Sequence, residues 1–599
     1  MCAIFGIVGD YEPTLAKYAL GKLSHRGPDF CGIVEQKELF FAHQRLSILD
    51  THHRSHQPLE HKGILISFNG EIYNYKELRE THPFEYRTNS DTEVILALYL
   101  KYKEKFVNYL RGMFAIAIYD SGKLMLFRDR LGKKPLFYYQ NQRQFVFASE
   151  LKAIKPFLEN VQMDEDALLS YLTYLAPTSP LTFYKGVKKL APSEYLVFEN
   201  FTCKVKNYFD LIDTPSSVIT SEEEAIKKIE QKLQESIELR LSSDVPIATL
   251  LSGGIDSATI NYYAKQKFDV QSYSLGFSEY KKYDELDEAK ESAKLLGIKN
   301  KTIIASKEEF IESFDAVFEA LDEPLNDPAA IPLYILFKHI KKDGFKVVLS
   351  GEGSDELFLG YRQYFEYIEL EKAKGLYHAN WLKKYFRSNF SMNREWEWYK
   401  RAFENEVIFR CSSEKFTDMQ KNILLRRNVR DGESMKYIQN YRDRFESSLH
   451  SDESIWFSYI DLHHFQSEHF LTKLDRVSMA HSIESRTPFL DHEFASLVFS
   501  IDPQLRYRDK VTKSLLKKVL YNKLPQPIIN RKKKGFSNPY MEYLVQSGRI
   551  GLIEEVNDQT GLFKKEILER YIKTARKGTF KQHIWGLFVL SWWIKKELL

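Results

Sequence analysis

The chain has 599 residues, of which 43% are apolar and 28% charged, and its formal net charge is +4. This length exceeds what one hydrophobic core usually supports, so at least two domains are expected. The composition is that of an ordinary soluble globular protein, and the small net charge gives no reason to expect a nucleic-acid partner.

Cysteine usage and the ends of the chain indicate a cytoplasmic setting. The four cysteines include no CxxC pair, so neither a zinc site nor a disulfide framework is expected. The N-terminus has no basic segment and no small-residue cleavage site, so no secretory signal is expected. The longest late apolar run, Ile584 to Ile594, is shorter than the roughly 20 residues that a membrane span needs. It predicts a buried helix and no membrane partner.

Residues 1–208 form the first predicted domain, in which short apolar runs alternate with polar or glycine-rich turns. The run 113–118 is apolar on both faces, so its strand should be covered above and below. Two stacked antiparallel sheets between helices, an α+β fold of the αββα sandwich type, satisfy this condition. The predicted elements are strands at 3–8, 40–49 and 64–68, hairpins at 113–127 and 135–148, and a helix after a capping box of Ser90 and Glu93.

Cys2 is a candidate nucleophile. If Met1 is removed, Cys2 carries both a thiol and a free α-amine. Such an amine, with a pKa of about 8, can act as general base for its own nucleophile. Any small residue is acceptable at position two, so the surrounding residues must decide whether this arrangement is functional.

Other polar positions of the first domain indicate an amino-acid site. Asn69 and Gly70 end the predicted strand 64–68, where an amide and a glycine N–H could hold an oxyanion. A simple Asn-Gly turn is the favoured interpretation of this pair in isolation. Arg45 is a cation within an apolar strand, and Asp91 stands at a helix start. Together they offer a guanidinium for an α-carboxylate and a carboxylate for an α-ammonium.

The second predicted domain spans residues 221–599, after a polar linker at 200–221. It opens with a capping box of Ser221 and Glu224 and a helix with apolar residues at helical spacing. Strand-like runs then alternate with helices, which predicts an α/β doubly wound parallel sheet. After Gly360 the pattern is helical, so a helical C-terminal part is expected. The strand-like runs are 245–251, 270–277, 301–305 and 346–349.

The most specific stretch, residues 252–257, reads Ser-Gly-Gly-Ile-Asp-Ser and follows the strand 245–251. Its two glycines let backbone N–H groups converge, and the dipole of the next helix adds to them, so the loop can hold an anion. Ser252 and Ser257 can donate to phosphate oxygens, and Asp256 would meet phosphate through Mg²⁺. The loop has no lysine and is not a Walker P-loop. It resembles the PP-loop of the ATP pyrophosphatases, which split ATP between the α and β phosphates.

Two later segments allow more than one interpretation. Residues 350–356 form a second glycine loop after a strand, but their carboxylates would meet phosphate only through a metal or a protonated partner. The competing interpretation of this loop is a solvated acidic turn. The basic run 531–536 is either a solvated face, which composition alone favours, or a phosphate contact.

The segments 2–6, 25–29, 45–50, 69–74 and 90–93 resemble the class II glutamine amidotransferase domain. Followed by the PP-loop and by the segment 471–491, they resemble the glutamine-hydrolysing asparagine synthetases of the bacterial B type. The resemblance covers nearly the whole chain. It implies an N-terminal nucleophile fold in which Cys2 attacks the glutamine amide, forms a thioester and releases ammonia.

The resemblance also implies roles for individual residues. Arg45, Glu71 and Asp91 would bind glutamine, and Asn69 and Gly70 would form the oxyanion hole. Asp256 and Asp355 would hold Mg²⁺ with pyrophosphate, and Glu352 would act in forming or consuming an acyl-adenylate. The implied ATP-binding residues are Leu250, Ser252, Gly253, Gly254, Asp256, Ser257, Leu275, Ser350, Gly351 and Lys533.

The reaction implied by the resemblance is ATP-dependent synthesis of asparagine from aspartate and glutamine, with channelled ammonia and a β-aspartyl-AMP intermediate. A second possibility is an enzyme of the same architecture that amidates another carboxylate, such as a sugar acid or a peptide side chain. A third is an enzyme that adenylates a tRNA base, which would need a basic domain. A fourth is an interaction protein with an inactive ammonia site. The oligomeric state stays open, and a homodimer is one possibility.

Overall fold

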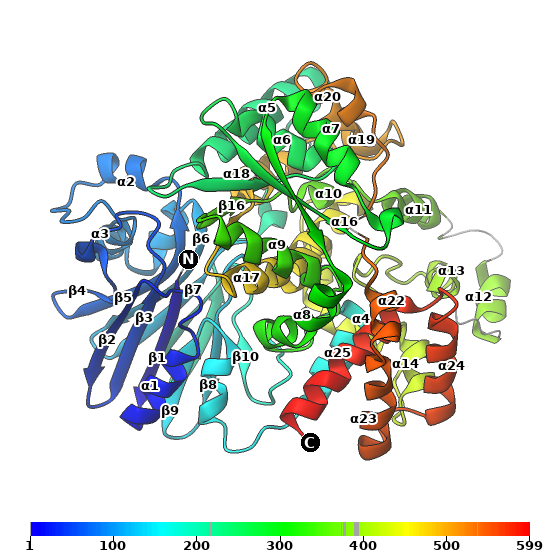
Figure 1. The fold of residues 1–599 in the computed structure, drawn as a ribbon, viewed down its shortest axis with the longest axis horizontal. Coiled ribbons are helices and arrows are strands. Elements are labelled where there is room, and N and C mark those ends of the chain that lie inside the picture. The colour runs from blue at the N-terminus through cyan, green and yellow to red at the C-terminus, as the bar shows by residue number, and fades with distance from the viewer. Residues whose placement is uncertain (1, 216, 373, 375–378, 389–393, 536) are drawn as a thin grey trace.

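The computed structural model describes residues 2–215, 217–372, 374, 379–388, 394–535 and 537–599. Strands between residues 3 and 207 form two antiparallel sheets, and strands between 247 and 486 form a parallel sheet (Figure 1). Met1, on whose removal the role of Cys2 depends, and Phe536, the last position of the basic run, lie outside the described residues.

The two antiparallel sheets have the strand orders β10-β8-β9-β1-β3-β2 and β12-β11-β7-β6-β5-β4. The first contains β1 (Ala3–Gly9), β2 (Phe30–Gln36), β3 (Leu39–Arg45), β8 (Phe137–Gln140), β9 (Gln144–Ala148) and β10 (Lys188–Lys189). The second contains β4 (Leu59–His61), β5 (Ile64–Ile72), β6 (Gly112–Asp120), β7 (Lys123–Arg128), β11 (Glu194–Glu199) and β12 (Thr202–Asn207). Both predicted hairpins are confirmed, as β6–β7 and β8–β9.

The central strand β6 shows why the two sheets stack. Its residues Ala115 and Ala117 pack in the core between the sheets, together with Phe147 of β9. On its opposite face, Phe114 and Ile116 pack in a second core that includes α3 (Thr92–Tyr102). Helix α1 (Pro13–Gly21) packs on the outer side of β1. The order helix, sheet, sheet, helix confirms the predicted αββα sandwich.

Two strand boundaries predicted for the first domain are wrong. Strand β3 ends at Arg45 and does not reach residue 49. Strand β5 does not end before Asn69, because Asn69 and Gly70 continue the pairing with β6, opposite Ala115 and Phe114. The Asn-Gly turn therefore does not form.

The predicted capping box of Ser90 and Glu93 is also wrong. Helix α3 begins at Thr92, and the Ser90 hydroxyl accepts a hydrogen bond from the Thr92 N–H at 3.0 Å. The Glu93 carboxylate instead accepts the Thr88 N–H at 2.7 Å, so it fixes the loop before the helix.

The parallel sheet has the strand order β15-β14-β13-β16-β17. Its strands are β13 (Ile247–Leu250), β14 (Gln271–Phe277), β15 (Lys299–Ala305), β16 (Val347–Leu349) and β17 (Glu484–Arg486). Helices α5 (Glu222–Leu239), α6 (Ile255–Ala264), α7 (Leu286–Leu296), α8 (Lys307–Leu321) and α9 (Ala330–Lys342) accompany it. The four predicted strands are confirmed, and the order β14-β13-β16 places the switch of direction beside β13, where such sheets bind ligands.

Two strands were not expected at their positions. Strand β12 occupies the first part of the predicted linker at 200–221, because it pairs with β11. Strand β17 lies within a segment that predicted a helix ended at Pro488. The helix α17 (Leu471–Met479) ends earlier, and the chain then pairs with β16.

The helical C-terminal part is confirmed, and it contains a π-helix, η8 (Asp461–Phe470), between α16 and α17. The buried helix predicted near the C-terminus is confirmed as α25 (Lys581–Glu597). No helix in the described part of the chain is long and apolar enough to cross a membrane. The remaining helices are α2 (Tyr75–Thr81), α4 (Glu165–Tyr174), α10 (Ser354–Leu357), α11 (Arg362–Glu371), α12 (Ala379–Ser388), α13 (Arg394–Glu404), α14 (Asp418–Leu424), α15 (Gln439–Ser447), α16 (Glu453–Ile460), α18 (His492–Phe499), α19 (Pro503–Tyr507), α20 (Ser514–Leu520), α21 (Gln526–Ile529), α22 (Tyr540–Gln546), α23 (Leu552–Thr560) and α24 (Lys565–Ala575).

Helix α17 joins the parallel-sheet part of the chain to the antiparallel sheets. The Arg26 guanidinium lies 2.7 Å from Asp475 of α17 and 2.8 Å from Glu150 after β9. All three side chains are buried. Breaking a buried ion pair leaves an uncompensated charge. This cluster therefore fixes the position of the parallel-sheet part relative to the antiparallel sheets.

Candidate active sites

Cys2 stands at the start of β1 and is 8% exposed. Its backbone nitrogen, which is the α-amine in a chain without Met1, donates to Asn69 Oδ1 at 3.0 Å. Its sulfur lies 3.9 Å from the Leu46 carbonyl oxygen. Burial raises the pKa of the Cys2 thiol, so a base is needed to form the thiolate at neutral pH.

Asn69 and Gly70 bring two hydrogen-bond donors to the same place. Asn69 is fully buried, and its Nδ2 has no hydrogen-bond partner among the described residues. Gly70 has no room for a side chain, because a Cβ there would lie 2.0 Å from the Met113 carbonyl oxygen. A free amide donor beside Cys2, within a strand that tolerates no side chain, has the features of an oxyanion hole.

The three predicted glutamine-binding residues lie on separate elements around Cys2. Arg45 is 4% exposed and donates to carbonyl oxygens of the loop after β3, including that of Asp50 at 2.6 Å. Asp91 accepts the Ile72 N–H at 2.9 Å, and burial raises its pKa to about 6. Glu71 has one buried oxygen without a partner in the described structure. These buried carboxylates can receive an ammonium group.

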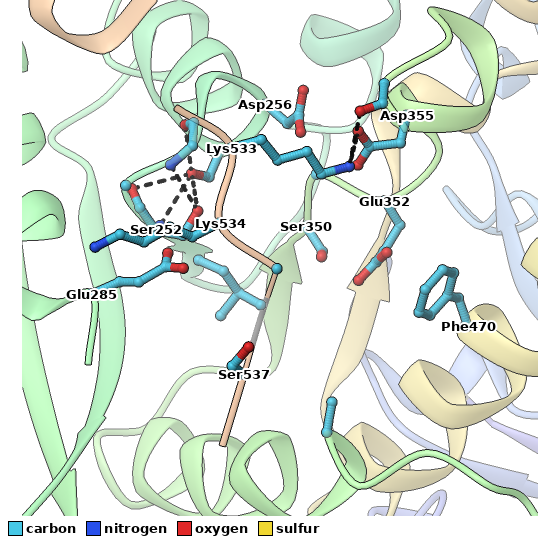
Figure 2. A pocket seen from close by; sticks show the side chains of 18 of the residues that line it. Ser252, Asp256, Glu285, Ser350, Glu352, Asp355, Phe470, Lys533, Lys534 and Ser537 are labelled. Carbon is cyan, nitrogen blue, oxygen red and sulfur yellow. Dashed lines mark hydrogen bonds and ion pairs between the residues drawn. The ribbon is translucent and has the colours of Figure 1, made fainter. Parts of the chain in front are cut away.

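The second site is a cavity of about 870 Å³ at the carboxyl ends of β13, β14 and β16. Its wall includes every predicted ATP-binding residue, namely Leu250, Ser252, Gly253, Gly254, Asp256, Ser257, Leu275, Ser350, Gly351 and Lys533. Glu352 and Asp355 also line it. The two glycine loops, far apart in the sequence, therefore lie in one cavity (Figure 2).

Hydrogen bonds within the first glycine loop fix its conformation. The Ser252 hydroxyl oxygen lies 3.0 Å from the Ser257 hydroxyl oxygen and accepts the Gly254 N–H at 3.1 Å. Arg531 donates to the Gly253 carbonyl at 2.7 Å. Helix α6 begins at Ile255, within this stretch, so its positive end faces the cavity.

A lysine that the sequence did not indicate joins the two predicted metal ligands. Lys513, at 5% side-chain exposure, lies 2.5 Å from Asp256 and 2.8 Å from Asp355. Lys533 reaches Asp355 as well, at 2.5 Å (Figure 2). Lys513 is part of no recognisable motif and lies 257 positions from Asp256, so no sequence signal could have found it.

The two carboxylates suit a magnesium ion that arrives with nucleotide. Asp256 Oδ1 is buried and has no hydrogen-bond partner among the described residues. Mg²⁺ is usually held by one or two protein carboxylates together with phosphate oxygens and water. Asp256 and Asp355 provide such a set, whereas no group of three or more His, Cys, Asp or Glu in the described structure could hold a metal alone.

Glu352 belongs to the second glycine loop and lines the cavity. Figure 2 shows its carboxylate on the side of the cavity where Phe470 of η8 lies. Burial raises the pKa of Glu352, and the nearby charge of Lys473 opposes this shift. Lys473 and its partner Asp327 were not predicted, because neither belongs to a glycine loop.

Comparison with known families matches both halves of the chain. Residues 1–209 match the family model described as a glutamine amidotransferase domain. Residues 228–595 match the family model described as asparagine synthase.

Individual relatives extend over most of the chain. The asparagine synthetase [glutamine-hydrolyzing] 1 of Bacillus subtilis is 33% identical, covering 99% of this chain and 96% of its own. A Gibberella zeae protein named amidase chry2 is 28% identical and covers 87% of this chain and 84% of its own. A solved Bacillus subtilis glutamine phosphoribosylpyrophosphate amidotransferase is 17% identical, covering 50% of this chain and 65% of its own with a TM-score of 0.28.

Proposed function

This chain belongs to the glutamine-hydrolysing asparagine synthetase family, and on that premise we propose that it makes asparagine from aspartate, glutamine and ATP. Glutamate, AMP and pyrophosphate are the other products. The observation that supports the ATP chemistry best is that Asp256 and Asp355, from two different glycine loops, meet at Lys513 in one cavity.

The glutamine half of the reaction begins at Cys2. The free α-amine takes the thiol proton, and Cys2 Sγ attacks the amide carbon of glutamine. The resulting oxyanion accepts hydrogen bonds from Asn69 Nδ2 and the Gly70 N–H. Collapse of this intermediate breaks the C–N bond, returns the proton to the leaving nitrogen and releases ammonia. Water then hydrolyses the thioester to glutamate.

Buried charges orient glutamine for this attack. Asp91 and Glu71 receive its α-ammonium, and Arg45 receives its α-carboxylate. The support is that Glu71 keeps a buried oxygen without a partner in the described structure, and that the pKa of Asp91 is raised in the absence of a cation. A bound ammonium would give Asp91 a positive neighbour and would donate to the free oxygen of Glu71, whose other oxygen lies 3.3 Å from Arg486.

The synthetase half activates aspartate. Its β-carboxylate attacks the α-phosphorus of ATP, the bond to the β-phosphate breaks, and pyrophosphate leaves. Ser252, Ser257 and the helix α6 N-terminus hold the phosphates, and Lys533 approaches them from the other side. Ammonia then attacks the acyl carbon of β-aspartyl-AMP, and AMP departs with the C–O bond electrons. Glu352 is placed to take the surplus proton of the attacking nitrogen.

Asp256 and Asp355 would hold Mg²⁺, which supplies positive charge to the pyrophosphate as it leaves. Lys513 neutralises these two carboxylates until the metal and the phosphates share them.

Ammonia must pass from one site to the other without protonation. Support for an internal route is that Ser350 of the second glycine loop donates its N–H to the Arg486 carbonyl at 2.9 Å, while the Arg486 guanidinium lies 3.3 Å from Glu71. The two sites therefore share a buried boundary. We place the enzyme in the cytoplasm because its four cysteines are all free, and a homodimer stays a prediction.

An incubation with glutamine, aspartate, ATP and Mg²⁺ tests this proposal directly. We expect asparagine, glutamate, AMP and pyrophosphate in equal amounts. Glutamate without asparagine would contradict the choice of acceptor. ADP in place of AMP would contradict the adenylation step.

The second candidate function is amidation of another carboxylate by the same chemistry. It is favoured by the relative named amidase chry2, which aligns along most of this chain under a different functional name. Replacing aspartate in the same incubation by a sugar acid or by a peptide with acidic side chains distinguishes the two.

A further inference from the structure

The synthetase cavity extends beyond Glu352 to a wall that the reaction described above does not use. This wall is built by the π-helix η8, the start of α17, the loop after α8 and the segment before α14. The residues of interest on it are Asp327, Lys415, Gln466, His469 and Lys473. A cavity wall with charges of both signs suits a small zwitterionic ligand.

Asp327 is a negative centre on this wall. It is 7% exposed, and its Oδ2 lies 2.7 Å from Lys473 and 3.8 Å from the His469 ring. Its Oδ1 accepts the Ala329 N–H at 2.9 Å. Burial lowers the pKa of His469 to about 4, so this ring is neutral at pH 7, and Lys473 is the cation paired with the Asp327 carboxylate.

Gln466 adds an acceptor to the same wall. It is 1% exposed, and its side-chain oxygen has no hydrogen-bond partner among the described residues. Gln466 and His469 both belong to η8, and both line the cavity. A buried acceptor without a donor costs free energy until a ligand satisfies it.

Lys415 is a cation whose ammonium has no anionic partner among the described residues. Its backbone N–H donates to the Thr173 carbonyl at 2.8 Å, which fixes the segment. No hydrogen bond or ion pair to its ammonium is found in the described part of the chain, whereas Lys473, Lys513 and Lys533 of the same cavity all have carboxylate partners. Burial and the charge of Arg394 lower the pKa of Lys415 to about 8, and Asp327 opposes this shift. A ligand carboxylate would supply the missing partner.

We propose that Lys415 binds the α-carboxylate of the acceptor amino acid and that Asp327 binds its α-ammonium. The side-chain carboxylate then extends past Glu352 to the loop Ser350–Gly351, where the α-phosphate of ATP lies. This inference rests on the proposed function and adds to it the residues that select a short α-amino dicarboxylate. An acceptor without the α-carboxylate leaves Lys415 without a carboxylate partner, and an acceptor without the α-ammonium loses the contact with Asp327, so each binds more weakly.

Three variants and two analogues test the assignment. Aspartate-dependent AMP formation is measured with ammonia as nitrogen donor, so that the glutamine site plays no part. The analogues are 3-aminopropanoate, which lacks the α-carboxylate, and butanedioate, which lacks the α-ammonium. Their inhibition constants against aspartate are measured on the wild type and on Lys415→Met, Lys415→Arg and Asp327→Asn.

For Lys415→Met, we expect the KM for aspartate to rise by about 10- to 100-fold, the loss typical of one charge-assisted hydrogen bond. The inhibition constant of 3-aminopropanoate should stay unchanged, because this analogue makes no contact with Lys415. Lys415→Arg should restore most of the affinity for aspartate. Asp327→Asn should weaken aspartate binding but leave butanedioate unchanged.

An exposed lysine provides the matched control. Lys436→Met removes an ammonium paired with Asp166 on the surface and should change no constant. Equal losses for aspartate and 3-aminopropanoate in Lys415→Met, or no loss for either, would overturn the assignment. Failure of the proposed function is distinguishable, because the wild type would then form no asparagine at any aspartate concentration.

Discussion

The guanidinium of Arg486, at the end of β17, forms an ion pair with Glu71 of β5 at 3.3 Å. Both side chains are buried, and Arg486 also donates to Glu484 at 2.6 Å. This ion pair connects the parallel sheet to the site around Cys2. A residue whose carbonyl supports the second glycine loop thus also sets the charge environment of the glutamine site.

Glu71→Gln should weaken glutamine binding without harming synthesis from ammonia. The substitution keeps the shape of the side chain but removes the charge that receives the α-ammonium, so we expect the KM for glutamine to rise by about 10- to 100-fold. Steady-state kinetics with glutamine and then with ammonia provide the measurement. Glu77→Gln, at an exposed position of α2, is the control. Equal losses with both nitrogen donors would show that Glu71 acts through Arg486 on the whole structure.

Cys2→Ala should abolish glutamine hydrolysis and leave asparagine synthesis from added ammonia intact. The reason is that the thiol acts only in the first half of the reaction, at a site separate from the ATP cavity. Glutamate and asparagine are measured with each nitrogen donor in turn. Cys31→Ala, at an exposed cysteine, should affect neither. Loss of both activities in Cys2→Ala would assign a structural role to this residue.

Much of the architecture could be predicted because it depends on local patterns. The run 113–118 is apolar on both faces, and a strand of that kind requires a layer on each side. The glycine loop at 252–257 follows a short apolar strand and precedes a helix, an order that places it at the carboxyl edge of a parallel sheet.

The contacts that complete the sites could not be predicted, because they join distant parts of the chain. Strand β17 has three residues, too few to show any periodicity, and its pairing with β16 is what brings Arg486 to Glu71. The strand was expected to end before Asn69 and Gly70, since an Asn-Gly pair in isolation favours a turn. The backbone pairing of both residues with β6 outweighs the local preference for a turn and places them beside Cys2.

Asp91 makes the glutamine site sensitive to pH. Burial raises its pKa to about 6, so below that pH the free enzyme carries a neutral Asp91 that attracts an ammonium group poorly. If the ionised form binds glutamine, the KM for glutamine at pH 5.5 should be about fourfold higher than at pH 7.5. KM and kcat are measured separately across this range. The titration of Asp91 should change KM, whereas the titration of the Cys2 thiol should change kcat.

The same carboxylate should cost stability at neutral pH. The folded pKa lies above the ordinary value, so the folded protein binds more protons than the unfolded chain between pH 4 and pH 6, and stability falls as the pH rises through this window. Asp91→Asn should therefore be at least as stable as the wild type at pH 7.5, should bind glutamine more weakly, and should lose the pH dependence of KM. Thermal unfolding of both proteins at pH 5 and pH 7.5 gives the comparison. A KM that still changes fourfold in Asp91→Asn would assign the dependence to another group.

Lys513→Ala tests how Lys513, a residue that the sequence did not indicate, contributes to the synthetase site. Its ammonium lies within 2.8 Å of both Asp256 and Asp355, so its removal leaves two half-buried carboxylates facing each other and takes a positive charge from the leaving pyrophosphate. We expect aspartate-dependent AMP formation to fall by about 10²- to 10³-fold, as when one preorganised transition-state donor is removed. Glutamine hydrolysis at Cys2 should persist, which shows that the variant is folded. Lys510→Ala, three residues earlier and paired with Glu369 on the surface, is the matched control and should keep full activity. Unchanged AMP formation in Lys513→Ala would mean that Lys513 only compensates charge in the absence of nucleotide, and that Lys533 alone serves the phosphates.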